Sequence, residues 1–171
     1  YAAEVVRRRW KDANVAIMGN HGAIKVTPSL HAVQFVNGLR EKFDKIFCFL
    51  GGGTEATGSQ LRLLAESLRL SAVSNWCLIP RFHPAYAKNP SPSGKTWQET
   101  WCNELQSLGM PSDLMMFTDE LKTEEVVVLS DVVFGGCPTD FTKAICAGKR
   151  AVSLFTKETK EAFTREGGLD Q

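Results

Sequence analysis

The feature that most constrains the fold is a wholly apolar run at residues 46–50, which leads into three consecutive glycines, Gly51, Gly52 and Gly53. A strand without alternation between apolar and polar residues is typical of a parallel sheet buried on both faces. After the glycines, residues 59–70 carry leucines at helical spacing. Strand, tight turn and helix in that order predict one unit of an α/β fold.

The same alternation of short apolar runs and amphipathic segments extends along the chain. We expect strands at 15–18, 46–50, 76–79, 114–117, 131–134 and 151–155, and helices at 29–42, 59–70, 97–108, 139–147 and 157–165. Ser29 is expected as a helix N-cap, Thr123 as the cap of a short helix or turn, and Gly148 as the residue that closes a helix. The pattern predicts a Rossmann-like, doubly wound parallel sheet of about six strands with helices on both faces.

Length and charge bound the domain organisation and the partners. The 171 residues, of which 43% are hydrophobic and 23% charged, suit one domain spanning residues 1–171. Lys and Arg total 20 against 19 Asp and Glu, and the formal charge of +1 gives no field to attract nucleic acid or an anionic membrane. We expect neither partner, and no apolar run reaches the roughly 18 residues of a membrane span.

The cysteines indicate a compartment and argue against two kinds of site. They are five in number and lie mostly in apolar runs: Cys48, Cys77, Cys102, Cys137 and Cys146. An odd count without a loop-rich framework fits a reducing, cytoplasmic compartment. No Cys-x-x-Cys pair is present, so we expect no metal site. A nucleophilic Cys137 is disfavoured because no His is near it in sequence and Pro138 follows it.

The turn after the apolar run is the first candidate binding site. Ligands of doubly wound sheets bind beyond the carboxyl ends of the strands, where the strand order reverses. Glycines there allow positive φ and bring backbone N–H groups close to an anion, which a helix N-terminus also attracts. The run is neither G-x-G-x-x-G nor a phosphate loop with its Lys, so a tight turn that needs backbone clearance is the alternative.

Polar residues next to these glycines extend the candidate site. Thr54, Ser59 and Gln60 could add hydrogen-bond donors, and Thr57 or Ser59 could cap the helix. Glu55 would place a negative charge nearby, which weighs against a bare phosphate as the ligand.

Two further turns carry candidate residues. In residues 80–84, Arg81 and His83 could jointly contact a pyrophosphate, or His83 could act on a sugar oxygen; the alternative is a structural or solvated His. In residues 135–140, Gly135 and Gly136 precede a Pro suited to the first helical position, which makes another anion site. There Thr139 or Asp140 could cap the helix, and Asp140 could instead accept a hydrogen bond from a ribose hydroxyl.

The order of these motifs resembles a known architecture. The glycine turn, R-F-H-P, and S-D-V-V-F-G-G-x-P-T-D-x-x-x-A-x-x-A-G-K-R-A-V-S-L are similar to the C-terminal, nucleotide-binding half of GT-B glycosyltransferases. The branch with UDP-N-acetylglucosamine 2-epimerases is the nearest. The stretch VAIMGNHGAI is similar to the segment with which that family crosses between its domains, so residues 1–22 are expected to be an interdomain crossover. The resemblance covers roughly residues 4–165.

The resemblance implies a substrate and roles for the candidate residues. The substrate would be a sugar nucleotide, such as a UDP-sugar, bound between two Rossmann-like domains without a further cofactor. Gly51, Gly52, Gly53 and Thr54 would face the diphosphate. His83 would be the catalytic histidine near the phosphates. The nucleotide would be lined by Gly135, Gly136, Thr139 and Asp140.

The chain departs from the family in two respects. Lys143 stands where the family has a Glu that binds ribose, and a cation cannot accept hydrogen bonds from hydroxyls. Either Asp140 takes that role, or ribose is held differently, or the site has decayed. The sequence also provides one domain where the architecture needs two, and it begins with Tyr1 rather than Met. We expect an N-terminal domain or a partner subunit to complete the cleft.

Two other classes of function stay open at this level. One is a non-catalytic Rossmann-like regulatory or interaction module, which the replacement at Lys143 favours. The other, less favoured, is an S-adenosylmethionine-dependent methyltransferase. That class wants its glycine turn after the first strand and an acidic residue at the end of the second. Here a strand already precedes residues 46–50, and the strand that follows them leads into Pro80 and Arg81.

Overall fold

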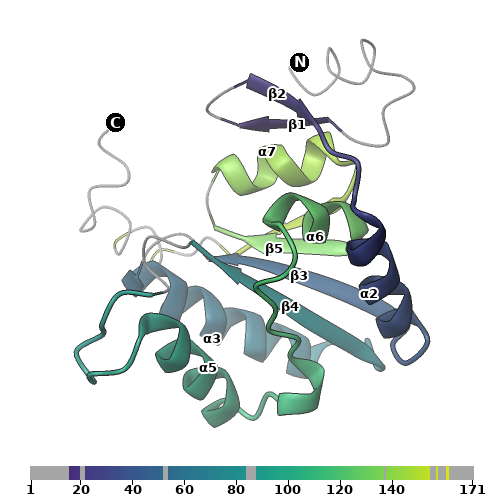
Figure 1. Cartoon of the computed structure of the whole chain (residues 1–171). Coiled ribbons are helices and arrows are strands. Elements are labelled where there is room, and N and C mark those ends of the chain that lie inside the picture. The colour runs from purple at the N-terminus through teal and green to yellow at the C-terminus, as the bar shows by residue number, and fades with distance from the viewer. Residues whose placement is uncertain are drawn as a thin grey trace.

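A parallel sheet lies at the centre of the computed structural model of the chain (Figure 1). The structure describes residues 16–19, 22–51, 54–83, 88–136, 138–154, 157 and 161, with the backbone alone at 16–19, 22–25, 54–56 and 138–141. Within these residues the sheet has four strands: β3 (Lys45–Gly51), β4 (Trp76–Phe82), β5 (Val132–Gly135) and β6 (Arg150–Ser153). Their order across the sheet is β4-β3-β5-β6, and every neighbouring pair is parallel.

Helices cover both faces of this sheet, as the sequence predicts (Figure 1). One face packs against α3 (Thr54–Leu70) and α5 (Trp97–Ser107). The opposite face packs against α2 (Leu30–Arg40), α6 (Thr123–Leu129) and α7 (Pro138–Cys146). The predicted α/β fold with a parallel sheet between two helical layers is confirmed.

The central strand β3 explains the unbroken apolar run. Phe47 and Phe49 pack with the α3 and α5 side, while Ile46, Cys48 and Leu50 pack with the α2 and α6 side. All five are buried, because helices cover both faces. A strand in this position has no polar face, so the apolar residues lose their alternation.

The strand count differs from the expected six or so, first at the N-terminal side. The predicted strand at 15–18 corresponds to β1 (Ala16–Gly19), which pairs antiparallel with β2 (Gly22–Lys25) and stays outside the parallel sheet. This hairpin contacts α7 (Figure 1). The two strands are separated by only two residues, a spacing that favours a tight antiparallel hairpin over a crossover.

The predicted strand at 114–117 is also absent from the described structure. A short 3₁₀ helix, η1 (Ser112–Leu114), is followed by a single parallel bridge between Met115 and Leu78. The Met116 N–H donates to the Leu78 carbonyl at 2.8 Å. The next bond along this edge would need an N–H at position 80, which Pro80 lacks, so the pairing stops there.

Several helix and strand ends differ from the expected ones. α3 begins at Thr54, so Thr57 and Ser59 lie inside the helix rather than at its N-cap. β4 runs on to Phe82, which places Arg81 in a strand. The N-cap of α6 is Lys122, one residue before the expected Thr123.

Other predicted ends are confirmed. Ser29 caps α2, its side chain accepting from the Ala32 N–H at 3.2 Å. Gly148 ends α7 with a φ of +68°, a conformation that favours glycine. Most of the predicted crossover segment 1–22 and of the predicted helix 157–165 lies outside the described residues.

At the amino end of the sheet, Asp131 ties three elements together. One carboxylate oxygen accepts from the Ile46 N–H at 2.8 Å, and Arg40 at the end of α2 donates to both carboxylate oxygens at 3.1 and 3.2 Å. Burial alone would raise the pKa of this carboxyl, but the hydrogen bonds from Arg40 and Ile46 lower it overall. Asp131 therefore fixes the start of β5 against the start of β3.

We predict that Asp131→Ala lowers the free energy of unfolding by about 1–3 kcal/mol, because it leaves the Ile46 N–H without its acceptor and the Arg40 guanidinium with the Leu129 carbonyl alone. Urea denaturation measures the change. Asp113→Ala, at an exposed residue of η1, is the matched control and should change stability by less than about 0.5 kcal/mol. Equal effects of the two substitutions would contradict the role given to Asp131.

Candidate functional site

The strand order reverses between β3 and β5. From β3 the chain crosses through α3 on one face to β4, and from β5 it crosses through α7 on the other face to β6. Leu50 and Gly135 are paired in register, so β3 and β5 end side by side. In open α/β sheets the crevice at such a reversal is where ligands bind.

Backbone hydrogen bonds place the predicted site residues along one edge of the sheet. The Gly51 carbonyl accepts from the His83 N–H at 3.2 Å, and the Gly135 carbonyl accepts from the Leu154 N–H at 2.8 Å. Gly136 follows Gly135 at the same edge. The structure thus brings together Gly51, His83, Gly135 and Gly136.

At this edge Gly51 and Gly136 are required for space. A β-carbon at Gly51 would lie 3.0 Å from the Phe82 ring and 3.1 Å from the Thr57 hydroxyl oxygen. One at Gly136 would lie 1.9 Å from Gln60 Nε2, closer than any real contact. Neither glycine has a positive φ. For Gly51, the sequence argument from φ is therefore wrong and the alternative, backbone clearance, is right.

Gln60, on the second turn of α3, is the unusual side chain of this edge. Its residue is 0% exposed, and neither Nε2 nor Oε1 has a hydrogen-bond partner. Leaving buried amide atoms unpaired costs about 1–3 kcal/mol each. Among the described residues the only other buried side-chain atom without a partner is Trp101 Nε1. Gln60 is thus a costly polar group directly over Gly136.

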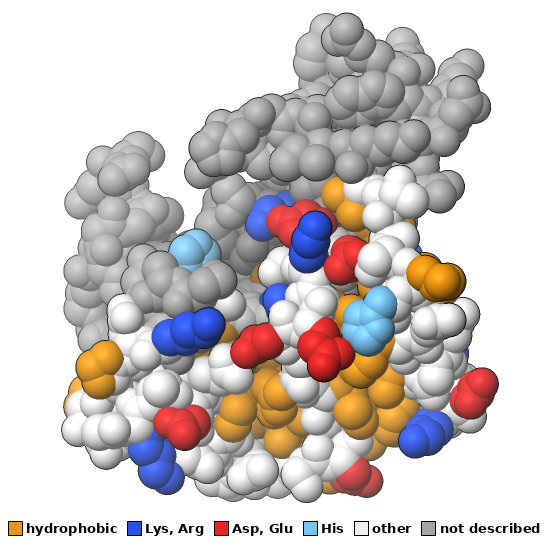
Figure 2. Space-filling view, viewed as in Figure 1, with side chains coloured by type: hydrophobic (Ala, Val, Ile, Leu, Met, Phe, Trp, Pro, Cys, Tyr) orange, Lys and Arg blue, Asp and Glu red, His pale blue; other side chains and the backbone are white. Residues whose placement is uncertain are grey.

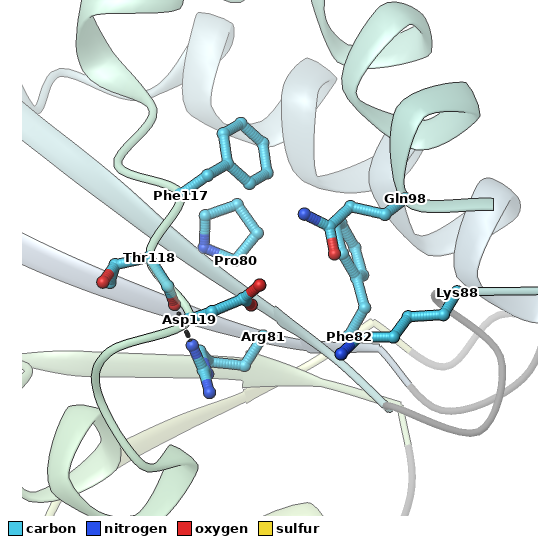
Figure 3. A pocket seen from close by; sticks show the side chains of 8 residues that line it. All are labelled: Pro80, Arg81, Phe82, Lys88, Gln98, Phe117, Thr118 and Asp119. Atoms are coloured by element: carbon cyan, nitrogen blue, oxygen red, sulfur yellow. Dashed lines mark hydrogen bonds between the residues drawn. The ribbon is translucent and has the colours of Figure 1, made fainter. Parts of the chain in front are cut away.

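Arg81 has a different place from the expected one. It lies in β4, and its guanidinium donates to the Thr118 carbonyl (Figure 3). It also donates to the Thr123 hydroxyl at 3.5 Å. These bonds hold the segment before α6 against β4. The predicted turn shared by Arg81 and His83 is therefore wrong, because only His83, which is exposed, follows the end of the strand.

The other predicted residues are placed in part. Gly52 and Gly53 lie outside the described residues. Thr54 is the first residue of α3, and Thr139 and Asp140 belong to the first turn of α7, at the same edge as Gly51 and Gly136. The roles of their side chains stay predictions.

A pocket of about 210 Å³ opens beside this edge, between β4 and the segment before α6 (Figure 3). It is lined by Pro80, Arg81, Phe82, Lys88, Gln98, Phe117, Thr118 and Asp119. The rings of Phe82 and Phe117 have centroids 6.5 Å apart and planes inclined by 27°. In Figure 3 the Gln98 amide and the Asp119 carboxylate point toward one another across the pocket. The pocket therefore combines flat apolar walls with polar groups.

Phe82 joins this pocket to the glycine edge, since the same ring packs against Gly51. Sequence analysis did not identify the pocket. Its lining comes from separate segments of the chain, and no spacing within any of them indicates that they meet.

Charged side chains gather over α6 and the segment before it (Figure 2). Lys143 of α7 forms an ion pair with Glu124 of α6 at 3.9 Å, and His31 of α2 is hydrogen-bonded to Glu120 at 3.0 Å. The Lys143 ammonium, which stands where the resembled family has a carboxylate, is therefore directed toward α6.

The described cysteines are placed as structural residues. Cys48, Cys77 and Cys146 are buried. Burial raises the pKa of the Cys77 and Cys102 thiols to about 11, so both stay protonated at neutral pH. Cys137 lies outside the described residues.

The part of the chain that the structure describes contains no group of three or more His, Cys, Asp or Glu suited to a metal ion. It also contains no helix with the length and apolarity to cross a bilayer.

One solved structure is similar to the chain. No protein-family model matches the chain, and no curated protein matches it. A solved structure, the C-terminal domain of a group 1 family glycosyl transferase from Francisella tularensis, is similar with a TM-score of 0.46 and 10% identity. That likeness covers 84% of this chain and 85% of that one.

Glu125 joins the start of α2 to the start of α6 at the carboxyl end of the sheet. Its carboxylate accepts from the Ser29 N–H at 2.8 Å and from the Lys122 N–H at 2.9 Å. Burial would raise the pKa of this carboxyl, but the two backbone hydrogen bonds lower it overall. The carboxylate thus holds the N-termini of α2 and α6 together, close to the segment that lines the pocket.

We predict a pH-dependent stability from this carboxylate. Because its folded-state pKa lies below the unfolded value of about 4.3, its contribution is present above that value and is lost as pH falls through the folded pKa. Glu125→Gln should therefore destabilise the chain at pH 7, and the difference from wild type should shrink below about pH 4. Urea midpoints at several pH values measure it. A difference that does not change between pH 7 and about pH 3 would contradict this account.

Proposed function

We propose that the carboxyl edge of the sheet binds a sugar nucleotide, with its diphosphate at the reversal between β3 and β5. The observation that carries the proposal is that α3 and α7 both start at this edge, on opposite faces of the sheet, within a few residues of Gly51 and Gly136. The first N–H groups of each helix have no partner within the helix and carry partial positive charge. Two such helix starts suit a diphosphate, which has two charged groups.

The pocket beside β4 supports a nucleotide or a sugar as the rest of the ligand. Phe82 and Phe117 offer flat surfaces on which a ring can stack, and Gln98 and Asp119 offer hydrogen bonds to its polar edge. At about 210 Å³ the pocket is smaller than the roughly 300–1,000 Å³ of sites that enclose a whole drug-sized ligand. It would therefore hold one ring of the sugar nucleotide.

The remainder of the ligand would lie on the open edge of the sheet. Such a site is suited to completion by a second surface that faces it. We propose that an N-terminal domain or a partner subunit supplies this surface, and that the chain is the nucleotide-binding half of a GT-B glycosyltransferase or a sugar-nucleotide epimerase. UDP is the nucleotide we expect. His83, exposed at the edge, would transfer a proton to or from the reacting oxygen.

One observation favours a second candidate function. Position 143, where the resembled family has a carboxylate that binds ribose, carries a lysine, and its ammonium is paired with Glu124. A Rossmann-like module without catalytic activity would tolerate this replacement. The two functions differ in whether the chain binds UDP.

Calorimetric titration with UDP, UDP-sugars and S-adenosylmethionine tests the proposal. We predict binding of UDP that His83→Ala weakens at least tenfold, about 1.4 kcal/mol, because the proposed site has this side chain next to the phosphates. His31→Ala, the matched control at the other described His, should bind UDP as wild type does. Absence of UDP binding would favour the non-catalytic module, and binding of S-adenosylmethionine in its place the methyltransferase.

A second prediction concerns the ribose. We predict that Asp140→Ala weakens UDP binding by about 1–3 kcal/mol, the cost of leaving a bound ribose hydroxyl without its acceptor. The substitution should weaken binding of 2′-deoxy-UDP less if the 2′-hydroxyl is the group bound. Asp113→Ala serves as the control for loss of a surface carboxylate. An Asp140→Ala variant with wild-type affinity for both nucleotides would refute the assignment.

A further inference from the structure

The strongest unexplained feature of the molecule is the amide of Gln60. A Gln that served packing alone would be better replaced by an apolar side chain of similar length, because its amide forms no hydrogen bond in the structure. The chain nevertheless places this group, 0% exposed, where the strand order reverses. It also leaves position 136 without a side chain, which the amide needs for room.

The position of the amide points to a ligand at the start of α7. Gln60 Nε2 lies 1.9 Å from where a β-carbon of Gly136 would be, so it sits directly against the backbone that leads into α7. The first N–H groups of that helix point out of the same region. An anion held by them would lie next to Gly136, within reach of a side chain in contact with that residue.

We propose that Gln60 is a ligand-contacting residue whose amide is left unpaired in the free protein and hydrogen-bonds to the bound nucleotide. Nε2 donates to a phosphate oxygen, and Oε1 accepts from a hydroxyl of the ribose or the sugar. This inference rests on the proposed function and adds to it a named residue in the core of the domain. Gln60 would also favour a nucleotide over a phosphate group alone. Phosphate oxygens can pair only with the Nε2 donor, whereas a nucleotide also offers a hydroxyl to Oε1.

Gln60→Met tests the proposal, since Met has a similar length and volume but makes no amide hydrogen bonds. We expect a Tm higher by ~3 °C or more, because a buried unpaired amide is removed. We also expect the Kd for UDP to rise about 10- to 100-fold, the loss typical of hydrogen bonds to charged groups. Gln106→Met, at an exposed Gln of α5, is the matched control and should change neither quantity.

Titration with inorganic diphosphate separates the two ends of the amide. If both ends are used, Gln60→Met should weaken binding of UDP more than binding of inorganic diphosphate. A Gln60→Met variant that binds UDP with the wild-type Kd would overturn the proposal, whatever its Tm. That result leaves the proposed function standing, whereas a wild-type chain that binds no UDP would overturn the proposed function and the role of Gln60 together.

The contact between Gln60 and Gly136 is testable without a ligand. Gly136→Ala should lower the Tm in the wild-type background, because the new methyl group overlaps the amide. In a Gln60→Ala background the same substitution should cost much less, since the space is free. Equal costs in the two backgrounds would show that the amide does not lie over Gly136 and would overturn the geometry on which the proposal rests.

Discussion

The parallel pairing of β3 with both β4 and β5 is the constraint on which the rest of the structure depends. Seven residues of β3 are in register with β4, and four of them are in register with β5 on its other side. Because the three strands run in one direction, they present their carboxyl ends at one edge. Helices follow β3 and β5 on opposite faces, so both of these helices start at that edge. The candidate site is a consequence of this topology before any side chain is considered.

The two ends of the sheet serve different purposes. At the amino end, Asp131 has its hydrogen bonds satisfied by Ile46 and Arg40, which is the pattern of a group that stabilises the fold. At the carboxyl end, the Gln60 amide is buried without a hydrogen-bond partner, and the atoms around Gly51 and Gly136 leave no room for a side chain at either position. Proteins keep such unfavourable local features mainly at functional sites. The contrast supports the proposal that the ligand binds at the carboxyl end.

Sequence reasoning predicted the layers of the fold because apolar periodicity reports directly on burial. It placed both ends of β3 and of α7 within one residue of the observed ends. It missed the start of α3, because residues 54–60 contain no apolar spacing and Gly58 favours no helix. It also counted 114–117 as a strand, since the effect of Pro80 on its neighbour depends on tertiary pairing that one sequence does not display.

The candidate site was predictable to a similar degree. Gly51, His83 and Gly135 could be assigned to one edge from the rule that parallel strands end together, and the structure brings them together there. That Gln60 is unpaired could not be predicted, because partners of a buried amide come from distant segments. The pocket between Phe82 and Phe117 depends on the same kind of long-range contact.

The most direct test of the central claim is a map of UDP binding by amide chemical shifts in a two-dimensional NMR titration. The account predicts saturable shifts at the N–H groups of Gly51, Gly136 and the first turn of α7, together with the side-chain amide of Gln60. Shifts confined to residues at the amino end of the sheet, such as Ile46 and Asp131, would contradict it. So would spectra that do not change at millimolar UDP.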